Sequence, residues 1–280
     1  MTAPFNEHRS IILTGASSGI GEALALKYAQ QGHVLWLNGR NAERLKDVAA
    51  RCRELGAEVH ADTVDVTELD NMQQWITAAA EPRGIDLVVA NAGISGGASS
   101  IGDEDETQVR DIFAVNLAGV LNTLLPALPI MQRQGHGHLA LMSSIAGFRG
   151  LPTSPAYSAS KAAVLAYGDG LRGELQHTGI DVSVICPGFV KSRITDANDF
   201  PMPFFMPTDK AANIIRRGLD KRRRRIAFPW QMRFAMWFIA AAPVIITDRF
   251  LANPKWKKNN FYCDVFRRAF SILRHLTTLR

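Results

Sequence analysis

The feature that most constrains the fold is a short apolar run that ends in a glycine-rich turn and leads into a helix. The run from Ser10 to Thr14 is followed by Gly15, Gly19 and Gly21, and a helix-like pattern then continues to Gln31. Such a turn presents backbone N–H groups and a helix N-terminus to a phosphate. An ordinary tight strand-to-helix connection has the same pattern, so the turn alone leaves both interpretations open.

Apolar segments of strand length alternate with helical patterns through most of the chain. Strands are expected at residues 10–14, 33–37, 58–63, 85–90, 138–143, 181–186 and 226–228. Helices are expected after the glycine turn and at residues 42–55, 68–80, 105–132, 154–176 and 208–220. This alternation predicts a doubly wound, Rossmann-like parallel sheet of about seven strands with helices on both faces. Ligands of such sheets bind at the carboxyl ends of the strands.

The end of the second expected strand indicates which dinucleotide would bind. In dinucleotide folds an acidic residue here binds the adenosine ribose, whereas an Arg accommodates a 2′-phosphate. Gly39 offers no carboxylate and Arg40 offers a cation, so NADP(H) is expected in preference to NAD(H). The hydroxyls of Ser17 and Ser18 could contact the same phosphate. The carboxylate of Asp65, after the third strand, would suit the adenine amino group.

Tyr157 and Lys161 stand four residues apart near the start of an expected helix. Ser154 followed by Pro155 is typical of an N-cap and first turn, and residues four apart share one helix face. The ammonium and the helix N-terminus both favour the phenolate, so the pKa of Tyr157 is expected below its usual value of about 10, as suits a general acid. A surface Tyr–Lys pair has the same spacing, so the pair alone does not establish chemistry.

Six motifs follow one another in order between about residues 10 and 220. They are Thr14-Gly15-x3-Gly19-x-Gly21, Asn91-Ala92-Gly93, Asn116, Ser144, Tyr157-x3-Lys161 and Pro187-Gly188. Together they resemble the short-chain dehydrogenase/reductase family, of the compact single-domain type. The resemblance implies that Tyr157 donates a proton to a carbonyl oxygen, or accepts one when an alcohol is oxidised. It implies further that Lys161 lowers the pKa of Tyr157 and binds the nicotinamide ribose, that Ser144 binds the substrate oxygen, and that Asn116 anchors a water linking Lys161 to solvent.

The resemblance also assigns residues to the cofactor. Those expected around the pyrophosphate are Gly15, Ser17, Gly19, Ile20 and Gly21. Asn91 and Gly93 would lie against the adenosine-side ribose, and Val66 joins Asp65 at the adenine. Those expected around the carboxamide are Pro187, Gly188 and Val190, with Ser192 where the family often has Thr. The chain is thus expected to be an NADPH-dependent reductase of ketones or aldehydes. The alternatives are an NADP-dependent alcohol or steroid-type dehydrogenase working in the oxidative direction, and a non-catalytic nucleotide-sensing scaffold.

Positive charge is concentrated at the C-terminus. Residues 221–280 carry 14 Lys and Arg against two Asp, a balance of +12, which leaves −6 for residues 1–220 when the whole chain is +6. This segment also holds 11 of the 23 aromatic residues, a composition typical of an interfacial anchor. We therefore expect a catalytic domain at residues 1–228 and a basic amphipathic helical extension at 229–280. A homo-oligomer is expected, and the extension has three possible contacts: a membrane surface, a second subunit, or the body of its own chain.

The remaining patterns bear on substrate and location. Apolar residues in the segment 190–207, notably Met202, Phe204, Phe205 and Met206, suggest a lid over a lipophilic substrate, or a loop that packs on the core. The three cysteines are odd in number and widely spaced, and the first residues lack an export pattern, so a cytoplasmic location is expected, with or without contact to the membrane's cytoplasmic face. The sequence has no metal-ligand pattern and no recognised nucleic-acid-binding motif, so neither a metal site nor specific nucleic-acid binding is expected.

Overall fold

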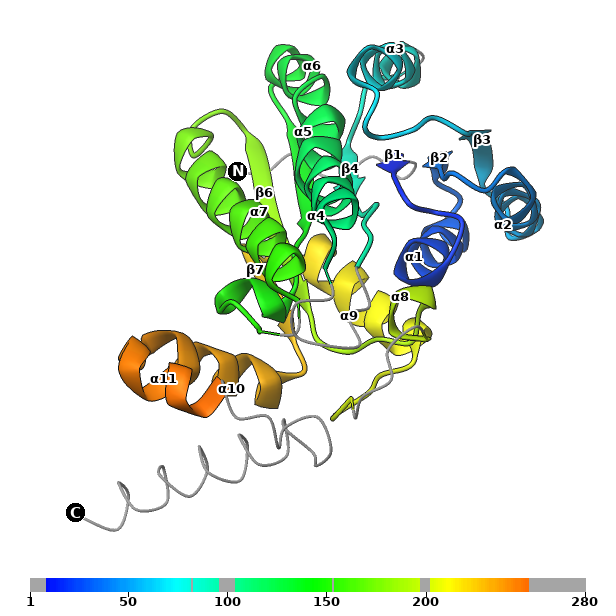
Figure 1. Cartoon of the computed structure of the whole chain (residues 1–280). Helices are drawn as coiled ribbons and strands as arrows, with labels where there is room; N and C mark the ends of the chain where they lie inside the picture. The colour runs from blue at the N-terminus through cyan, green and yellow to red at the C-terminus, as the bar shows by residue number, and fades with distance from the viewer. Residues whose placement is uncertain (1–8, 82, 96–103, 153, 197–201, 252–280) are drawn as a thin grey trace.

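Seven parallel strands form a single sheet in the computed structural model, which describes residues 9–81, 83–95, 104–152, 154–196 and 202–251 (Figure 1). The strand order is β3-β2-β1-β4-β5-β6-β7. The strands are β1 (Ser10–Leu13), β2 (Val34–Asn38), β3 (Glu58–Asp62), β4 (Leu87–Ala90), β5 (Gly137–Met142), β6 (Ile180–Pro187) and β7 (Arg225–Phe228). The order reverses between β1 and β4, which opens a crevice at their carboxyl ends. The predicted doubly wound sheet is confirmed.

Helices cover both faces of the sheet because β1, β4, β5 and β6 are apolar on both sides. One face packs on α1 (Gly19–Ala29), α2 (Ala42–Glu54) and α9 (Thr208–Asp220). The other packs on α3 (Leu69–Ala80), α4 (Glu106–Phe113), α5 (Gly119–Leu124), α6 (Ala127–Gln134) and α7 (Pro155–Glu174). The short helices are α8 (Arg193–Asp196) and the 3-10 turn η2 (Ile145–Phe148). These bounds lie within a few residues of the predicted ones.

The helix expected at residues 105–132 is not uniform. Between α4 and α5 the backbone widens into a π-helical turn, η1 (Ala114–Ala118), and a short turn before α6 separates α5 from α6. The helical stretch Glu106–Gln134 is long and apolar enough to span a membrane by length and composition, but 44% of its most apolar window is buried inside the body. Val115, Val120, Leu124, Ala127 and Met131 of this stretch lie in the core cluster beside the sheet, so we interpret it as a core helix.

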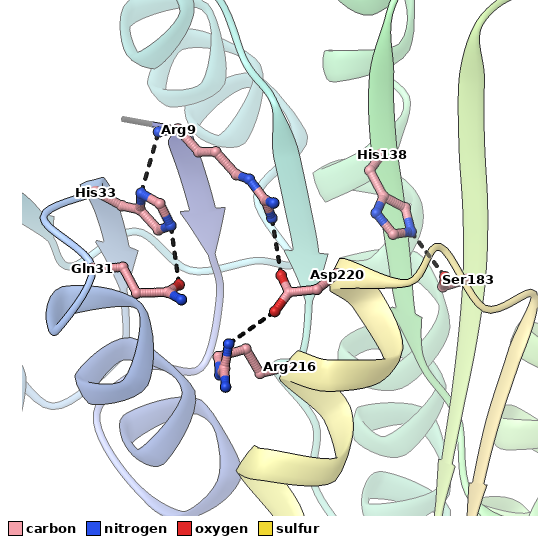
Figure 2. Close-up of polar contacts among 7 residues, drawn as sticks. All are labelled: Arg9, Gln31, His33, His138, Ser183, Arg216 and Asp220. Carbon is pink, nitrogen blue, oxygen red and sulfur yellow. Dashed lines mark hydrogen bonds and ion pairs between the residues drawn. The ribbon is translucent and has the colours of Figure 1, made fainter. Parts of the chain in front are cut away.

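Polar contacts fasten α9 at the amino ends of the strands (Figure 2). The guanidinium of Arg9, just before β1, pairs with Asp220 at 3.1 Å, and Arg216 pairs with the same carboxylate at 2.9 Å. The Arg9 backbone N–H donates to His33 Nδ1, which leaves His33 Nε2 to donate to Gln31. These contacts lie at the opposite end of the strands from the crevice, so they stabilise the fold away from any ligand.

The C-terminal extension begins with two described helices, α10 (Trp230–Ala241) and α11 (Val244–Leu251), while residues 252–280 lie outside the described part. Met232, Ala235 and Met236 on α10 are buried against η2 and β6. The opposite face of α10 is exposed, with Trp230 62% and Trp237 59% accessible. Part of the predicted extension is therefore packed on the body of its own chain.

Candidate active site

A cleft of about 660 Å³ runs along the carboxyl ends of the strands. The predicted site residues that line it are Gly15, Ser17, Ser18, Gly19, Ile20, Arg40, Val66, Asn91, Gly93, Ser144, Tyr157, Lys161, Pro187, Gly188, Val190 and Ser192. Gly21, Asp65 and Asn116 are not among the lining residues. Residues that are far apart in the sequence thus line one cleft, as expected because the carboxyl ends of parallel strands lie at the same edge of the sheet.

The glycine turn between β1 and α1 forms one wall of the cleft. Gly15 and Gly19 have φ values of +67° and +59°, a backbone region that residues with a Cβ adopt at a cost. A Cβ on Gly15 would lie 2.8 Å from the Ala92 Cα, so the turn also depends on close approach to the end of β4. Thr14 fastens the two segments, because its Oγ1 accepts from the Asn91 N–H at 3.1 Å. The turn is a cradle of backbone groups that fits a pyrophosphate.

Gly21 lies behind this turn and does not line the cleft. A Cβ at this position would lie 2.2 Å from Gly15 O and 2.6 Å from Asn91 Nδ2. Asn91 Nδ2 itself donates to Thr14 O at 2.9 Å and to Gly15 O at 3.2 Å. Gly21 therefore supports the turn by letting α1 approach it, and Asn91 holds the turn from the other side.

The adenosine end of the cleft has cations and no carboxylate among its lining residues. Arg40 is exposed at the rim just before α2, and Arg44 in the first turn of α2 lines the same end. A Cβ on Gly39 would lie 2.8 Å from the Ser17 Cβ, so a side chain there would displace the phosphate turn. Asp65 is exposed, and its Oδ1 accepts from Thr67 N and Oγ1. Its predicted contact with adenine stays a prediction.

Ser144, Tyr157 and Lys161 converge from two segments, η2 and α7. Ser144 is the N-cap of η2, and its Oγ accepts from the Ala146 N–H at 3.1 Å. Tyr157 is half-buried on the first turn of α7, and Lys161 follows one turn later, only 3% exposed. Lys161 Nζ lies 5.8 Å from the centre of the Tyr157 ring and donates to Met142 O at 2.9 Å. The expected N-cap at Ser154 has the right position, but its side chain forms no capping hydrogen bond.

The pKa of Tyr157 is shifted in the opposite direction from the one expected from the sequence. Burial raises the pKa of Tyr157, and hydrogen bonding with Ser144 opposes that effect without reversing it. Burial also lowers the pKa of Lys161 from 10.5 to about 8. The prediction that Lys161 and the helix N-terminus lower the pKa of Tyr157 is therefore wrong for the protein without cofactor. The phenol is neutral at pH 7, which is the form able to donate a proton.

Asn116 lies close to Lys161, fully buried in the π-helical turn η1. Its Oδ1 accepts from the Ile94 N–H at 2.8 Å, and its Nδ2 donates to Ile94 O at 2.9 Å and to Ser160 Oγ at 3.1 Å. A Cβ on Gly93 would lie 3.1 Å from Asn116 Oδ1 and 3.3 Å from Lys161 Nζ. Asn116 thus fixes the backbone beyond β4, and it meets Lys161 only across Gly93.

The nicotinamide end of the cleft is shaped by the segment after β6. Pro187, Gly188 and Val190 line it, and Ser192 is held by Thr195, whose Oγ1 accepts from the Ser192 N–H at 2.8 Å. A Cβ on Gly188 would lie 2.8 Å from Met232 Sδ. The glycine at this position therefore allows α10 to approach the cleft wall.

Several lining residues were not predicted from the sequence. They are Asn38, Gly39, Asn41, Arg44, Ala92, Ile94, Ser95, Val115, Met142, Ser143, Arg193 and Thr195. Arg44 lies in the first turn of α2, close to Arg40 at the strand end where a 2′-phosphate is expected, so its charge and position could have identified it.

The apolar lid is only partly as expected. Residues 197–201 lie outside the described part, and Met202, Phe204, Phe205 and Met206 do not line the cleft. Met206 is buried in the core and pairs with Val190 in an isolated bridge, whereas Phe204 and Phe205 are exposed. Met206 therefore packs on the core, which agrees with the alternative prediction of a loop packed on the body of the chain.

A doubly wound sheet whose cleft brings a glycine turn together with Ser144, Tyr157 and Lys161 is typical of dinucleotide-dependent oxidoreductases. The model of the family described as short chain dehydrogenase matches residues 9–200, and the chain belongs to this family. An uncharacterized oxidoreductase of Myxococcus xanthus is 41% identical over 226 residues, 80% of this chain and 89% of that protein.

Two solved structures are similar over most of the chain. A short-chain dehydrogenase from Sphingobium yanoikuyae in complex with NADPH has a TM-score of 0.71 and 28% identity, covering 78% of this chain and 86% of that one. A short-chain dehydrogenase/reductase from Burkholderia phymatum in complex with NAD has a TM-score of 0.76 and 26% identity, covering 90% and 98%. Both dinucleotides thus occur among the neighbours.

Proposed function

We propose that this enzyme reduces ketones or aldehydes, preferably lipophilic ones, with NADPH. The convergence of Ser144, Tyr157 and Lys161 on the cleft carries the proposal. Bound at the cleft, the nicotinamide would supply the hydride. Two hydroxyls, from Ser144 and Tyr157, would stabilise the negative charge that develops on the substrate oxygen. Tyr157, neutral at pH 7 because burial raises its pKa, would donate the proton.

The other side chains would hold this arrangement. Lys161 Nζ lies beside Tyr157 and would bind the nicotinamide ribose, while Asn116 would anchor the proton relay behind it. The preference for NADPH rests on Arg40 and Arg44 at the adenosine end and on Gly39, where a side chain would meet Ser17. Oxidation of an alcohol or hydroxysteroid by NADP uses the same residues, with Tyr157 as base, and the supply of cofactor and substrate sets the direction.

A carbonyl panel tests this proposal. NADPH and NADH oxidation would be followed with butanal, decanal, 2-decanone, cyclohexanone and a 3-oxodecanoyl thioester, with Tyr157→Phe as the matched inactive control. We expect faster turnover of the longer members with NADPH, and at least about a hundredfold loss in Tyr157→Phe. Turnover of no member, in either direction, would favour the nucleotide-sensing scaffold instead.

We also propose that the extension places this enzyme on the cytoplasmic face of a membrane. The arginine run contributes less than its charge suggests, because Arg222 pairs with Asp181 and Arg225 with Asp169. Support comes instead from the exposed apolar face of α10 and α11, where Ile245 is 83% accessible, and from the six net positive charges of residues 252–280. Contact with a second subunit is the alternative occupant of this face.

Vesicle binding separates these alternatives. The full chain should co-sediment with vesicles containing phosphatidylglycerol, less so at high salt, and a Trp230→Ser/Trp237→Ser variant should bind more weakly. A concentration-dependent dimer that the same variant disrupts, without vesicle binding, would favour the subunit contact.

A further inference from the structure

The C-terminal helices pack against the segment that follows Ser144. Met232 and Met236 on α10 share an apolar cluster with Ile145 and Leu151, which lie at the start of η2 and just beyond its end. Figure 1 shows α10 and α11 in orange beyond the end of β7, below the green segment that leads into α7. The extension thus covers one side of the segment that follows Ser144.

An ionic contact adds to this apolar one at the far end of η2. Arg149 Nη2 donates to Thr247 Oγ1 at 3.0 Å and to Asp248 Oδ1 at 3.0 Å, both on α11. Thr247 is 4% exposed and its hydroxyl donates to Val244 O, so its oxygen is oriented to accept from Arg149. Arg149 Nε is buried and bonds no described residue. The guanidinium is partly buried and held by two partners, of which Thr247 is buried and Asp248 is exposed.

Any movement of η2 would be transmitted to the catalytic side chains. Ser144 caps η2, accepting from Ala146 N through its Oγ and from Gly147 N through its carbonyl at 3.0 Å. Gly147 packs on the backbone of Lys161, where a Cβ would lie 2.8 Å from the Lys161 carbonyl carbon and oxygen. The four residues between Ser144 and Arg149 therefore contact both the Ser144 hydroxyl and the backbone of Lys161.

We propose that Arg149 is a positioning residue, which fastens η2 to α11 through Thr247 and Asp248 and thereby sets the position of the Ser144 hydroxyl. This inference rests on the role proposed for Ser144. Misplacement of a reacting group by about 1 Å can cost about a hundredfold in rate. The contact with α11 thus links the extension to turnover, although no residue of α11 lines the cleft.

The test compares Arg149→Ala, Arg149→Lys and Thr247→Val with Arg233→Ala, a matched control that removes an exposed arginine from α10. Steady-state rates would be measured with the panel member that the wild-type enzyme reduces fastest, and NADPH affinity by fluorescence. Hydrogen exchange of the peptide spanning residues 144–151 would be followed in the full chain.

For Arg149→Ala we expect kcat to fall about tenfold or more, while the Kd for NADPH changes less than about twofold, because the phosphate turn is distant in the cleft. Exchange at residues 144–151 should accelerate, and exchange in β1 should not. Arg149→Lys should recover part of kcat, since an ammonium can still pair with Asp248. Thr247→Val should resemble Arg149→Ala in a milder form, and Arg233→Ala should resemble the wild type.

Two outcomes would overturn the inference. One is wild-type kcat and wild-type exchange in Arg149→Ala. The other is a uniform rise of exchange across the chain with kcat preserved, which would show that Arg149 only stabilises the fold. If Ser144→Ala itself keeps the wild-type rate while Arg149→Ala loosens residues 144–151, the role proposed for Ser144 fails and the anchoring of η2 stands.

Discussion

Replacing Gly21 by alanine should weaken NADPH binding, although Gly21 does not touch the cleft. The added Cβ would lie 2.2 Å from Gly15 O and 2.6 Å from Asn91 Nδ2, where ordinary contact begins near 3.4 Å. The phosphate turn or α1 must therefore move by about 1 Å, and overpacking of this kind costs about 1–3 kcal/mol. If that cost falls on the bound conformation of the turn, the Kd for NADPH rises about 5- to 150-fold.

A helix elsewhere in the chain supplies the control. Gly170 is exposed in α7, and a Cβ there would meet nothing within 4 Å. Gly170→Ala should leave the Kd unchanged and raise the free energy of unfolding by about 0.5–1 kcal/mol, because alanine is the better helix former. Fluorescence titration with NADPH and thermal unfolding measure both quantities. Wild-type NADPH affinity in Gly21→Ala would refute the supporting role assigned to this glycine.

Three further outcomes are expected. Arg40→Ala should weaken NADPH binding about fivefold or more while NADH binding stays constant; an equal change for both cofactors would contradict a contact with the 2′-phosphate. Asn116→Ala should lower the free energy of unfolding by about 1–3 kcal/mol, because the partly buried Ile94 N–H and carbonyl each lose a partner; urea titration measures this, and a loss below about 0.5 kcal/mol would argue against it. Burial lowers the pKa of Lys161 to about 8 from 10.5, so between these pH values the unfolded chain keeps a proton that the folded chain has lost. The stability of the wild type relative to Lys161→Met should therefore rise by about 2 kcal/mol from pH 7 to pH 9.5, and a constant difference would contradict the buried lysine.

Sequence patterns predicted the sheet well because each strand is a local signal. The apolar run of β4 and the glycine turn after β1 identify themselves within a few residues, and the carboxyl ends of parallel strands must meet. The positions of Gly15, Arg40 and Asn91 on one cleft follow from that topology, because each comes just after a strand. Tyr157 lies on α7, and its place in the cleft was expected from the family resemblance.

Properties set by contacts between distant segments were missed. The resemblance assigned Asn116 to anchoring a water, but the sequence did not predict that the helix widens into a π turn around it, where its amide bonds both backbone groups of Ile94. The predicted direction of the Tyr157 pKa shift was wrong, because burial raises this pKa and depends on the whole fold, which a local sequence pattern does not show. Gly21 was assigned to the phosphate, whereas it acts from behind the turn.

The burial of Lys161 shows why such contacts matter for the chemistry. Its Nζ donates to Met142 O, its own carbonyl accepts from Ser143 Oγ at 2.7 Å, and Gly147 packs on its backbone. The end of β5 and the segment η2 thus hold this lysine by both its side chain and its main chain. Because Ser144 caps η2, a displacement of η2 would move the Ser144 hydroxyl and Lys161 together. An anchor on η2, such as the contact between Arg149 and α11, would therefore act on Ser144 and Lys161 at once, and its loss should appear in kcat before it appears in cofactor affinity.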